Sequence, residues 1–165
     1  MENRVEILRR HIDEIVLAQT KRHGELWFVE HHLHSVSNFA AMLAIKRKLN
    51  HEIAIMIGLL HDIHSLLTDD SKDHALHGSA RAREILRPLN IVTDEELEMI
   101  CTAVKHHSTK NAVHDVYSEL VKDADVLSHY FFNPSLPIIK HEQARLENLL
   151  CELGLGLGFA KSVKI

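Results

Sequence analysis

The chain has 165 residues, of which 45% are hydrophobic and 25% charged, and its formal net charge is −4. This length suits one domain with a substantial core, and the lack of a dense basic stripe argues against nucleic-acid binding. No apolar run is long enough to span a membrane, and the charged N-terminus is unlike a signal peptide. Two distant cysteines, Cys101 and Cys151, indicate reduced thiols in the cytoplasm. The compositional outlier is fifteen histidines spread along the chain.

Glycine and proline are scarce, and no segment alternates apolar and polar residues over the length of a β-strand. This pattern predicts an all-α fold, a single compact bundle of about six to eight helices. The predicted helices cover approximately residues 4–20, 26–49, 53–62, 74–86, 93–106, 117–130 and 138–150.

Local signals set several of these boundaries. His23-Gly24 reads as a stop signal after the first helix, and residues 65–72 read as a polar loop. Pro88 ends the helix that begins near His74. The run Thr93-Asp94-Glu95-Glu96 predicts a capping box at the start of the next helix.

The chain divides into four expected segments of one domain. We expect residues 1–24 to form an N-terminal packing helix and residues 25–135 to form a metal-binding core. Residues 136–152 would add a C-terminal helix of the same domain, and residues 153–165 a flexible tail. The glycines of this tail lack the spacing of a phosphate-binding loop.

The pair His61-Asp62 closes an apolar helix, residues 53–60, that carries no charge. It supplies one neutral nitrogen ligand and one anionic oxygen ligand from a single helical turn. Burying such groups is costly without compensation, and a bound cation provides it. The pair therefore indicates a metal site.

Other candidate ligands occur before and after this pair, each at the end or on the inner face of a predicted helix. Helix ends that converge on one cavity are a common way for bundles to build metal sites. These candidates are His32, His74, His106, His107 and Asp125.

The ordered series resembles the HD superfamily of metal-dependent phosphohydrolases over about residues 28–133. The matching pieces are His32-Leu33-His34-Ser35-Val36, Leu59-Leu60-His61-Asp62-Ile63, Asp73-His74-Ala75-Leu76-His77-Gly78, Lys105-His106-His107-Ser108 and Lys122-Asp123-Ala124-Asp125-Val126-Leu127.

The resemblance implies an HD-domain helical bundle with a metal ligand at each matching position. One metal would be held by His32, His61, Asp62 and Asp125. A second would be held by His74, His106 and His107, with Asp62 bridging the two. The additional histidines are similar to the binuclear branch, which includes dinucleoside-polyphosphate hydrolases and HD-GYP phosphodiesterases.

The chain also departs from these relatives. His64-Ser65 stands where many of them carry Gly-Lys, so a cationic substrate contact is lost. The Gly-Tyr-Pro signature is absent after His107, which argues against hydrolysis of cyclic dinucleotides. The reaction class is therefore better supported than the substrate.

The expected cofactors are two divalent transition metal ions. Imidazole and carboxylate ligands together suit iron, manganese, cobalt, nickel or zinc. Two such ions ~3.5–4 Å apart would ionise a shared water, and the hydroxide would attack phosphorus. Asp62 would serve catalysis as the bridge, and His64 as proton donor to the leaving group unless it is an ordinary surface histidine. Three cations that flank the ligand segments are candidates for phosphate contacts: Arg81, Lys105 and Lys110.

Neighbouring residues compete for several of these positions. His31 and His34 compete with His32, but the spacing to Val36 favours His32. Asp123 competes with Asp125 from another face of its helix. His77 lies one turn after His74 and fits a neighbour of the site better than a ligand. His129, one turn after Asp125, suits a hydrogen-bond partner or a core residue.

The sequence thus predicts a cytoplasmic phosphohydrolase that acts on a small, phosphorylated, nucleotide-like substrate, with no nucleic-acid or membrane partner. The phosphate would be held as a phosphomonoester or a phosphoanhydride. Two other functions stay open: a di-iron oxygenase of the same fold, and a non-catalytic ligand-binding module stabilised by metal. Homo-oligomer formation is left open.

Overall fold

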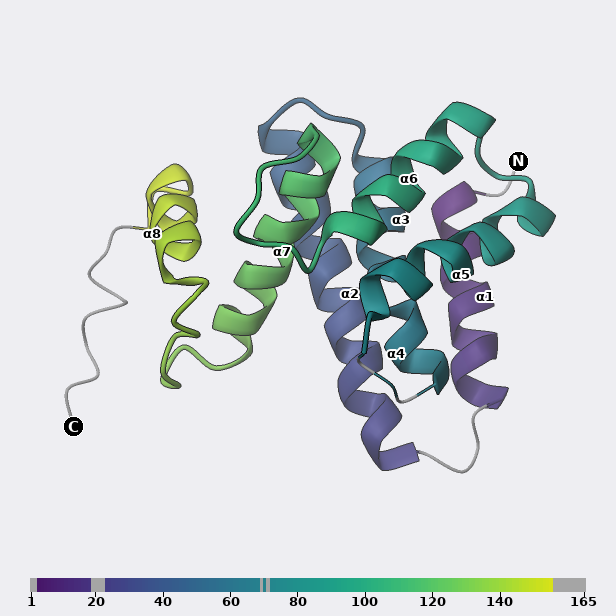
Figure 1. Ribbon diagram of the computed structural model, residues 1–165, viewed down its shortest axis with the longest axis horizontal. Helices are drawn as coiled ribbons and strands as arrows, with labels where there is room; N and C mark the ends of the chain where they lie inside the picture. The colour runs from purple at the N-terminus through teal and green to yellow at the C-terminus, as the bar shows by residue number, and fades with distance from the viewer. Residues whose placement is uncertain (1–2, 19–22, 69, 71, 156–165) are drawn as a thin grey trace.

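The computed structural model describes residues 3–18, 23–68, 70 and 72–155, and every regular element in these ranges is a helix (Figure 1). This confirms the predicted all-α fold. The helices are α1 (Arg4–Ala18), α2 (His23–Lys46), α3 (His51–Leu60), α4 (Ile63–Thr68), α5 (His74–Leu89), α6 (Asp94–His106), α7 (Val116–Phe132) and α8 (Gln143–Glu152). No helix among the described residues is long and apolar enough to cross a membrane.

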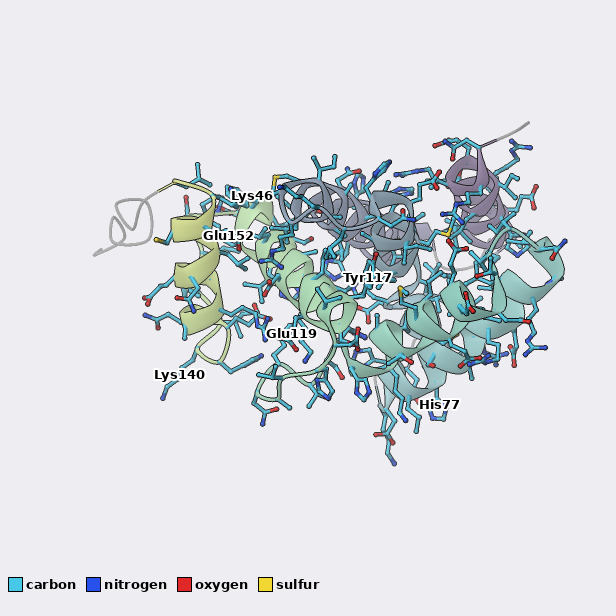
Figure 2. The ribbon with its side chains drawn as sticks, turned by 90° about the horizontal axis from the view of Figure 1, so that it is seen from above. Lys46, His77, Tyr117, Glu119, Lys140 and Glu152 are labelled. Atoms are coloured by element: carbon cyan, nitrogen blue, oxygen red, sulfur yellow. The ribbon has the colours of Figure 1, made fainter. Side chains whose placement is uncertain are left out.

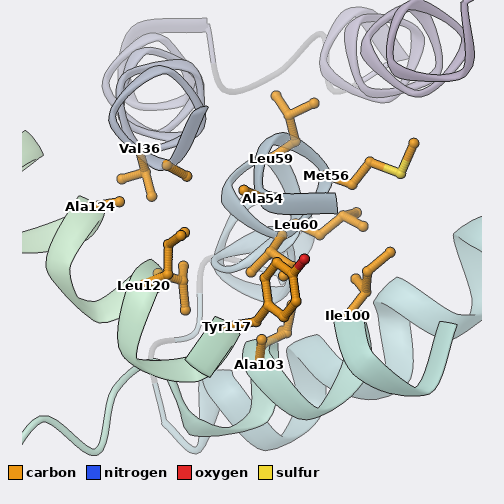
Figure 3. Packing of buried hydrophobic residues seen from close by; sticks show 14 of the residues in the cluster. Val36, Ala54, Met56, Leu59, Leu60, Ile100, Ala103, Tyr117, Leu120 and Ala124 are labelled. Carbon is orange, nitrogen blue, oxygen red and sulfur yellow. The ribbon is translucent and has the colours of Figure 1, made fainter. Parts of the chain in front are cut away.

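Helix α3 forms the centre of the core because it is apolar on almost every side. Its neighbours α2, α6 and α7 surround it with buried side chains such as Val36, Ile100 and Leu120 (Figure 3). Gly58 allows α2 to come very close, since a Cβ atom there would lie 2.5 Å from the Cα atom of Ser37. This contact brings the end of α3 next to the middle of α2.

Helices α5 and α6 form an antiparallel pair beside α3 (Figure 1). The predicted capping box at the start of α6 is present, with the Thr93 hydroxyl accepting from the Glu96 amide and the Glu96 carboxylate accepting from the Thr93 amide. Arg4 of α1 ties this region to α3, because it pairs with Glu52 at 2.8 Å and with Glu96 at 2.9 Å.

A chain of ion pairs fixes α8 against α7 and the end of α2. Arg145 contacts Asp123 at 2.5 Å and Glu119 at 2.9 Å. Arg47 contacts Asp123 and Glu152, each at 2.7 Å. Glu119 and Glu152 lie on the side of the molecule where α7 and α8 face each other (Figure 2). Asp123 is thus engaged by two arginines, which agrees with the prediction that it points away from the Asp125 face.

Two predicted stop signals were wrong. His23-Gly24 does not end a helix but lies in the first turn of α2. Pro88 lies inside α5, in its last turn, so the helix continues past the proline. The helix ends instead at Asn90, whose φ of 50° is the left-handed conformation that asparagine tolerates at a C-cap.

The segments on either side of the core also differ from prediction. The expected loop at 65–72 contains part of α4, which forms because Ile63 and Leu66 are buried. The last helix was predicted to start near residue 138 but starts at Gln143. Ile138 packs on the core without helical structure, and Glu142 turns its side chain inward. From residue 156 onward, the predicted tail lies outside the residues that the structure describes.

Candidate metal centre

Five helices converge on one cluster of histidines and aspartates. His32 comes from α2, and His61 and Asp62 follow the last residue of α3. His74 opens α5, His107 caps α6, and Asp125 lies in the middle of α7. The order of the helices in the bundle therefore brings together residues that are up to 93 positions apart in the sequence.

The first half of the cluster surrounds His32. Its Nε2 atom lies 3.1 Å from Asp125 Oδ1 and 3.2 Å from the Nε2 atom of His61. Asp62 Oδ2 lies 3.7 Å from His61 Nε2 and 4.0 Å from His32 Nε2. His32 is thus shared by two groups of ligand spacing, one with His61 and Asp62 and one with Asp125 and His129.

The second half lies on the other side of Asp62. Asp62 Oδ1 is 3.2 Å from His107 Nε2 and 3.4 Å from His74 Nε2. The two imidazole Nε2 atoms are 3.1 Å apart. Asp62 therefore turns one carboxylate oxygen toward each pair of histidines.

Hydrogen bonds at the Nδ1 atoms of three histidines determine that Nε2 faces the metal centre. His61 Nδ1 lies 2.8 Å from the Gly58 carbonyl, and His107 Nδ1 lies 2.8 Å from the Val104 carbonyl. A carbonyl accepts only, so Nδ1 carries the proton and donates it, which leaves the Nε2 lone pair free. His32 Nδ1 is held likewise by the Ser128 hydroxyl, which donates its own proton to Ser35.

These tautomers fit a bound cation. The lone pairs of His32 Nε2 and His61 Nε2 face each other at 3.2 Å and repel unless a positive charge lies between them. Asp62 Oδ1 and Asp125 Oδ1 are buried without a hydrogen-bond partner, which is costly in the absence of a cation. The donor set of imidazole nitrogens and carboxylate oxygens matches divalent transition metals.

The protonation of the central residues also suits metal binding. Burial lowers the pKa of His61 to about 4, so its ring is neutral at pH 7 although Asp62 opposes the shift. Burial alone would raise the pKa of Asp62, but the neighbouring imidazoles of His61 and His107 favour its carboxylate form and lower the pKa. The pKa of Asp125 is also lowered, because contacts with His32 and Lys110 exceed the effect of burial.

Six of the seven predicted ligands are thus brought together, while His106 is not. His106 stacks on His114 with ring centroids 4.0 Å apart, and it belongs to none of the ligand groups in the described part of the chain. The geometry of the described residues therefore gives no support to the expected position of His106 at the second metal. At the end of α6 the two adjacent rings diverge: His107 turns toward Asp62, whereas His106 turns toward His114.

The structure also separates the competing histidines. His34 faces α1, where its ring contacts Arg9 at 3.2 Å, and His31 is exposed. His74 rather than His77 reaches Asp62; the His77 ring lies 4.9 Å from that of His64. His64 is buried next to the cluster, with an Nδ1 atom that has no partner. Burial lowers the pKa of His64, which favours the neutral ring, and its role as a proton donor stays a prediction.

The predicted phosphate contacts are dispersed. Arg81 is exposed and pairs with Glu84 at 2.7 Å, and Lys105 lies on an exposed face of α6. Lys110 instead joins the cluster, where its Nζ atom lies 2.5 Å from Asp125 and 2.9 Å from Glu142. The contacts described for Arg81 and Lys105 include none of the six ligand residues of the cluster.

Glu142 and the full role of His129 were missed by the sequence interpretation. The Glu142 carboxylate is buried and lies 3.2 Å from His129 Nδ1, and His129 Nε2 lies 3.4 Å from Asp125 Oδ1. His32, Asp125 and His129 form a third group with metal-ligand spacing. Glu142 gave no signal because it was placed within a predicted amphipathic helix.

Comparison with known proteins agrees with this geometry. The family model for the HD domain matches residues 29–130, a range that includes all six ligand residues of the cluster. No curated protein and no solved structure matches the chain. HD domains are generally metal-dependent hydrolases that bind divalent metals. The matched region covers more than half of the sequence, and the chain belongs to the HD-domain family.

Proposed function

We propose that the protein is a phosphohydrolase that cleaves a phosphomonoester or phosphoanhydride of a small, nucleotide-like molecule with the help of two divalent metal ions. The observation that carries this proposal is the position of Asp62. One of its oxygens faces His61 and His32, and the other faces His107 and His74. A carboxylate shared by two sets of imidazoles is what a pair of closely spaced cations requires.

In this proposal His32, His61 and Asp62 would hold one ion together with Asp125, which lies 3.1 Å from His32. His74, His107 and Asp62 would hold the other. When bound, such ions act as Lewis acids that lower the pKa of water and offset the charge on phosphoryl oxygens.

The protein's own residues supply rigid positioning. The Gly58 and Val104 carbonyls hold two imidazoles in the tautomer that presents Nε2. Lys110 and His129 contact Asp125, so this carboxylate is fixed from two sides. Preorganised ligands of this kind need little rearrangement during phosphoryl transfer. Both cysteines are free, which supports a cytoplasmic location as part of the proposal.

The test is release of inorganic phosphate from p-nitrophenyl phosphate by the metal-loaded protein. We expect Asp62→Ala to lower the rate at least about a hundredfold, because both ions lose a ligand. Asp13→Ala is the matched control, since Asp13 has a 53% exposed side chain on α1. A fully active Asp62→Ala protein would contradict the proposal. Oxygen consumption by the iron-loaded protein without phosphate release would favour the oxygenase instead.

A further inference from the structure

A cavity of about 490 Å³ lies between α2, α7 and the segment that leads to α8. Its size falls within the range of small-molecule sites. Most of its wall is apolar, with side chains that include Val126, Tyr130, Phe131, Leu136, Ile138 and Ile139. The cavity therefore suits an apolar group.

The cavity adjoins the metal centre at two side chains. His32 and His129 both line it, and both belong to the ligand groups around Asp125. Their rings stack in parallel with centroids 5.1 Å apart. A ligand in the cavity would therefore lie directly beside the metal centre.

The charges around the cavity restrict what can enter. The described lining residues include no lysine or arginine, and the only carboxylate among them is Glu142. Glu142 is 3% exposed, and its charge is met by Lys110 at 2.9 Å and by His129 at 3.2 Å. The wall therefore offers no free cation to a second phosphate, and it disfavours a polyphosphate chain.

Several apolar side chains that line the cavity are partly exposed to solvent. Phe131 is 40% exposed, Leu136 57% and Ile139 41%. Clustered apolar side chains around a concave site usually mark a binding surface. These three side chains can pack against the faces of a flat apolar ring.

We propose that this cavity binds the apolar, aryl-type group of a phosphomonoester whose single phosphate lies at the metal centre. This inference rests on the proposed function and narrows its substrate class. Hydrolysis would form a bond from the water oxygen to phosphorus and break the bond from phosphorus to the aryl oxygen. A proton from water ends on that oxygen, so the products are inorganic phosphate and the aryl alcohol.

The experiment compares three phosphomonoesters on the metal-loaded full-length protein: 1-naphthyl phosphate, adenosine monophosphate and glycerol 2-phosphate. We expect kcat/KM to be highest for 1-naphthyl phosphate, by at least about tenfold over glycerol 2-phosphate, because the naphthyl group buries the most apolar surface and is also the better leaving group. The cavity accounts for the part of this preference that a variant of its wall removes. Ile139→Asp places a charge in the wall and should reduce this preference by about tenfold. Ile45→Asp is the matched control: Ile45 is 66% exposed on α2, is not among the lining residues, and should keep the preference.

Each outcome has a separate meaning. Equal kcat/KM values for the three esters, or a preference unchanged in Ile139→Asp, would overturn the inference and leave the phosphohydrolase intact. If no ester is cleaved, the proposed function fails, and binding of 1-naphthyl phosphate by fluorescence titration decides the inference. Binding weakened by Ile139→Asp but not by Ile45→Asp would support the cavity as the site. Binding that is absent, or equal in both variants, would overturn it.

Discussion

Lys110 and Asp125 form a buried ion pair at the edge of the metal centre. The Lys110 Nζ atom lies 2.5 Å from Asp125 Oδ2, while Asp125 Oδ1 faces His32 at 3.1 Å. The pKa of Lys110 is raised, because the carboxylates of Asp125 and Glu142 more than offset the effect of burial. Asp125 is therefore held by a lysine on one oxygen and presents the other to the centre.

This pairing predicts that Lys110→Met destabilises the metal-free protein by about 3 kcal/mol, since it removes the lysine that contacts two buried carboxylates. Bound metal supplies positive charge next to Asp125, so the loss should be smaller in the metal-loaded protein. Urea unfolding of both forms measures the difference. Lys140→Met is the control, because Lys140 lies on the exposed segment before α8 (Figure 2). Equal losses with and without metal would contradict the account.

The stability of the metal-free protein should also depend on His61 between pH 4 and 6.5. The pKa of His61 is lowered to about 4 in the folded state from the ordinary 6.5, so the unfolded chain binds the proton first as pH falls. The His61 contribution is thus complete above pH 6.5 and is lost as pH falls to about 4, up to roughly 3 kcal/mol.

Unfolding of chelator-treated protein across this range tests the prediction. Native protein should lose stability more steeply with falling pH than His61→Gln does, because the variant has no imidazole to protonate there. The comparison cancels the effects of other histidines, including His129, whose raised pKa acts in the opposite direction. Parallel profiles for the two proteins would show that His61 is not the group responsible.

Gly58 should be intolerant of any side chain. A Cβ atom at this position would lie 2.5 Å from the Cα and 2.7 Å from the N atom of Ser37, and backbone cannot move aside cheaply. We expect Gly58→Ala to cost about 3 kcal/mol. Gly78→Ala is the matched change, since its Cβ would lie 3.4 Å from its nearest neighbours, and it should cost less than about 1 kcal/mol. Similar unfolding free energies for both variants would refute the close approach of α2 and α3.

The fold could be predicted largely because its helices have strong local signals. The Thr93 capping box and the apolar run of α3 define two elements without tertiary information. Boundaries failed where tertiary packing outweighed local preference. Residues 63–68 became helical because Ile63 and Leu66 are buried, and Pro88 was tolerated in a last helical turn.

The candidate site was predictable to the extent that its ligands follow one another in a recognisable order. His32 and His74 were correctly separated from His34 and His77 as the residues near Asp62. His106 was misplaced because an ordered motif does not show which of two adjacent rings turns inward. Glu142 could not be found, since its contact with His129 depends on where the segment after α7 returns to the bundle.

The most direct test of the account is the metal content of the full-length protein purified without added metal, measured by elemental analysis. We expect two equivalents of a divalent transition metal per chain, two also in Asp13→Ala, and less than one in Asp62→Ala, because Asp62 contacts both halves of the cluster. A native protein that contains no metal and takes up none on titration would contradict the account. So would an Asp62→Ala protein that keeps both equivalents.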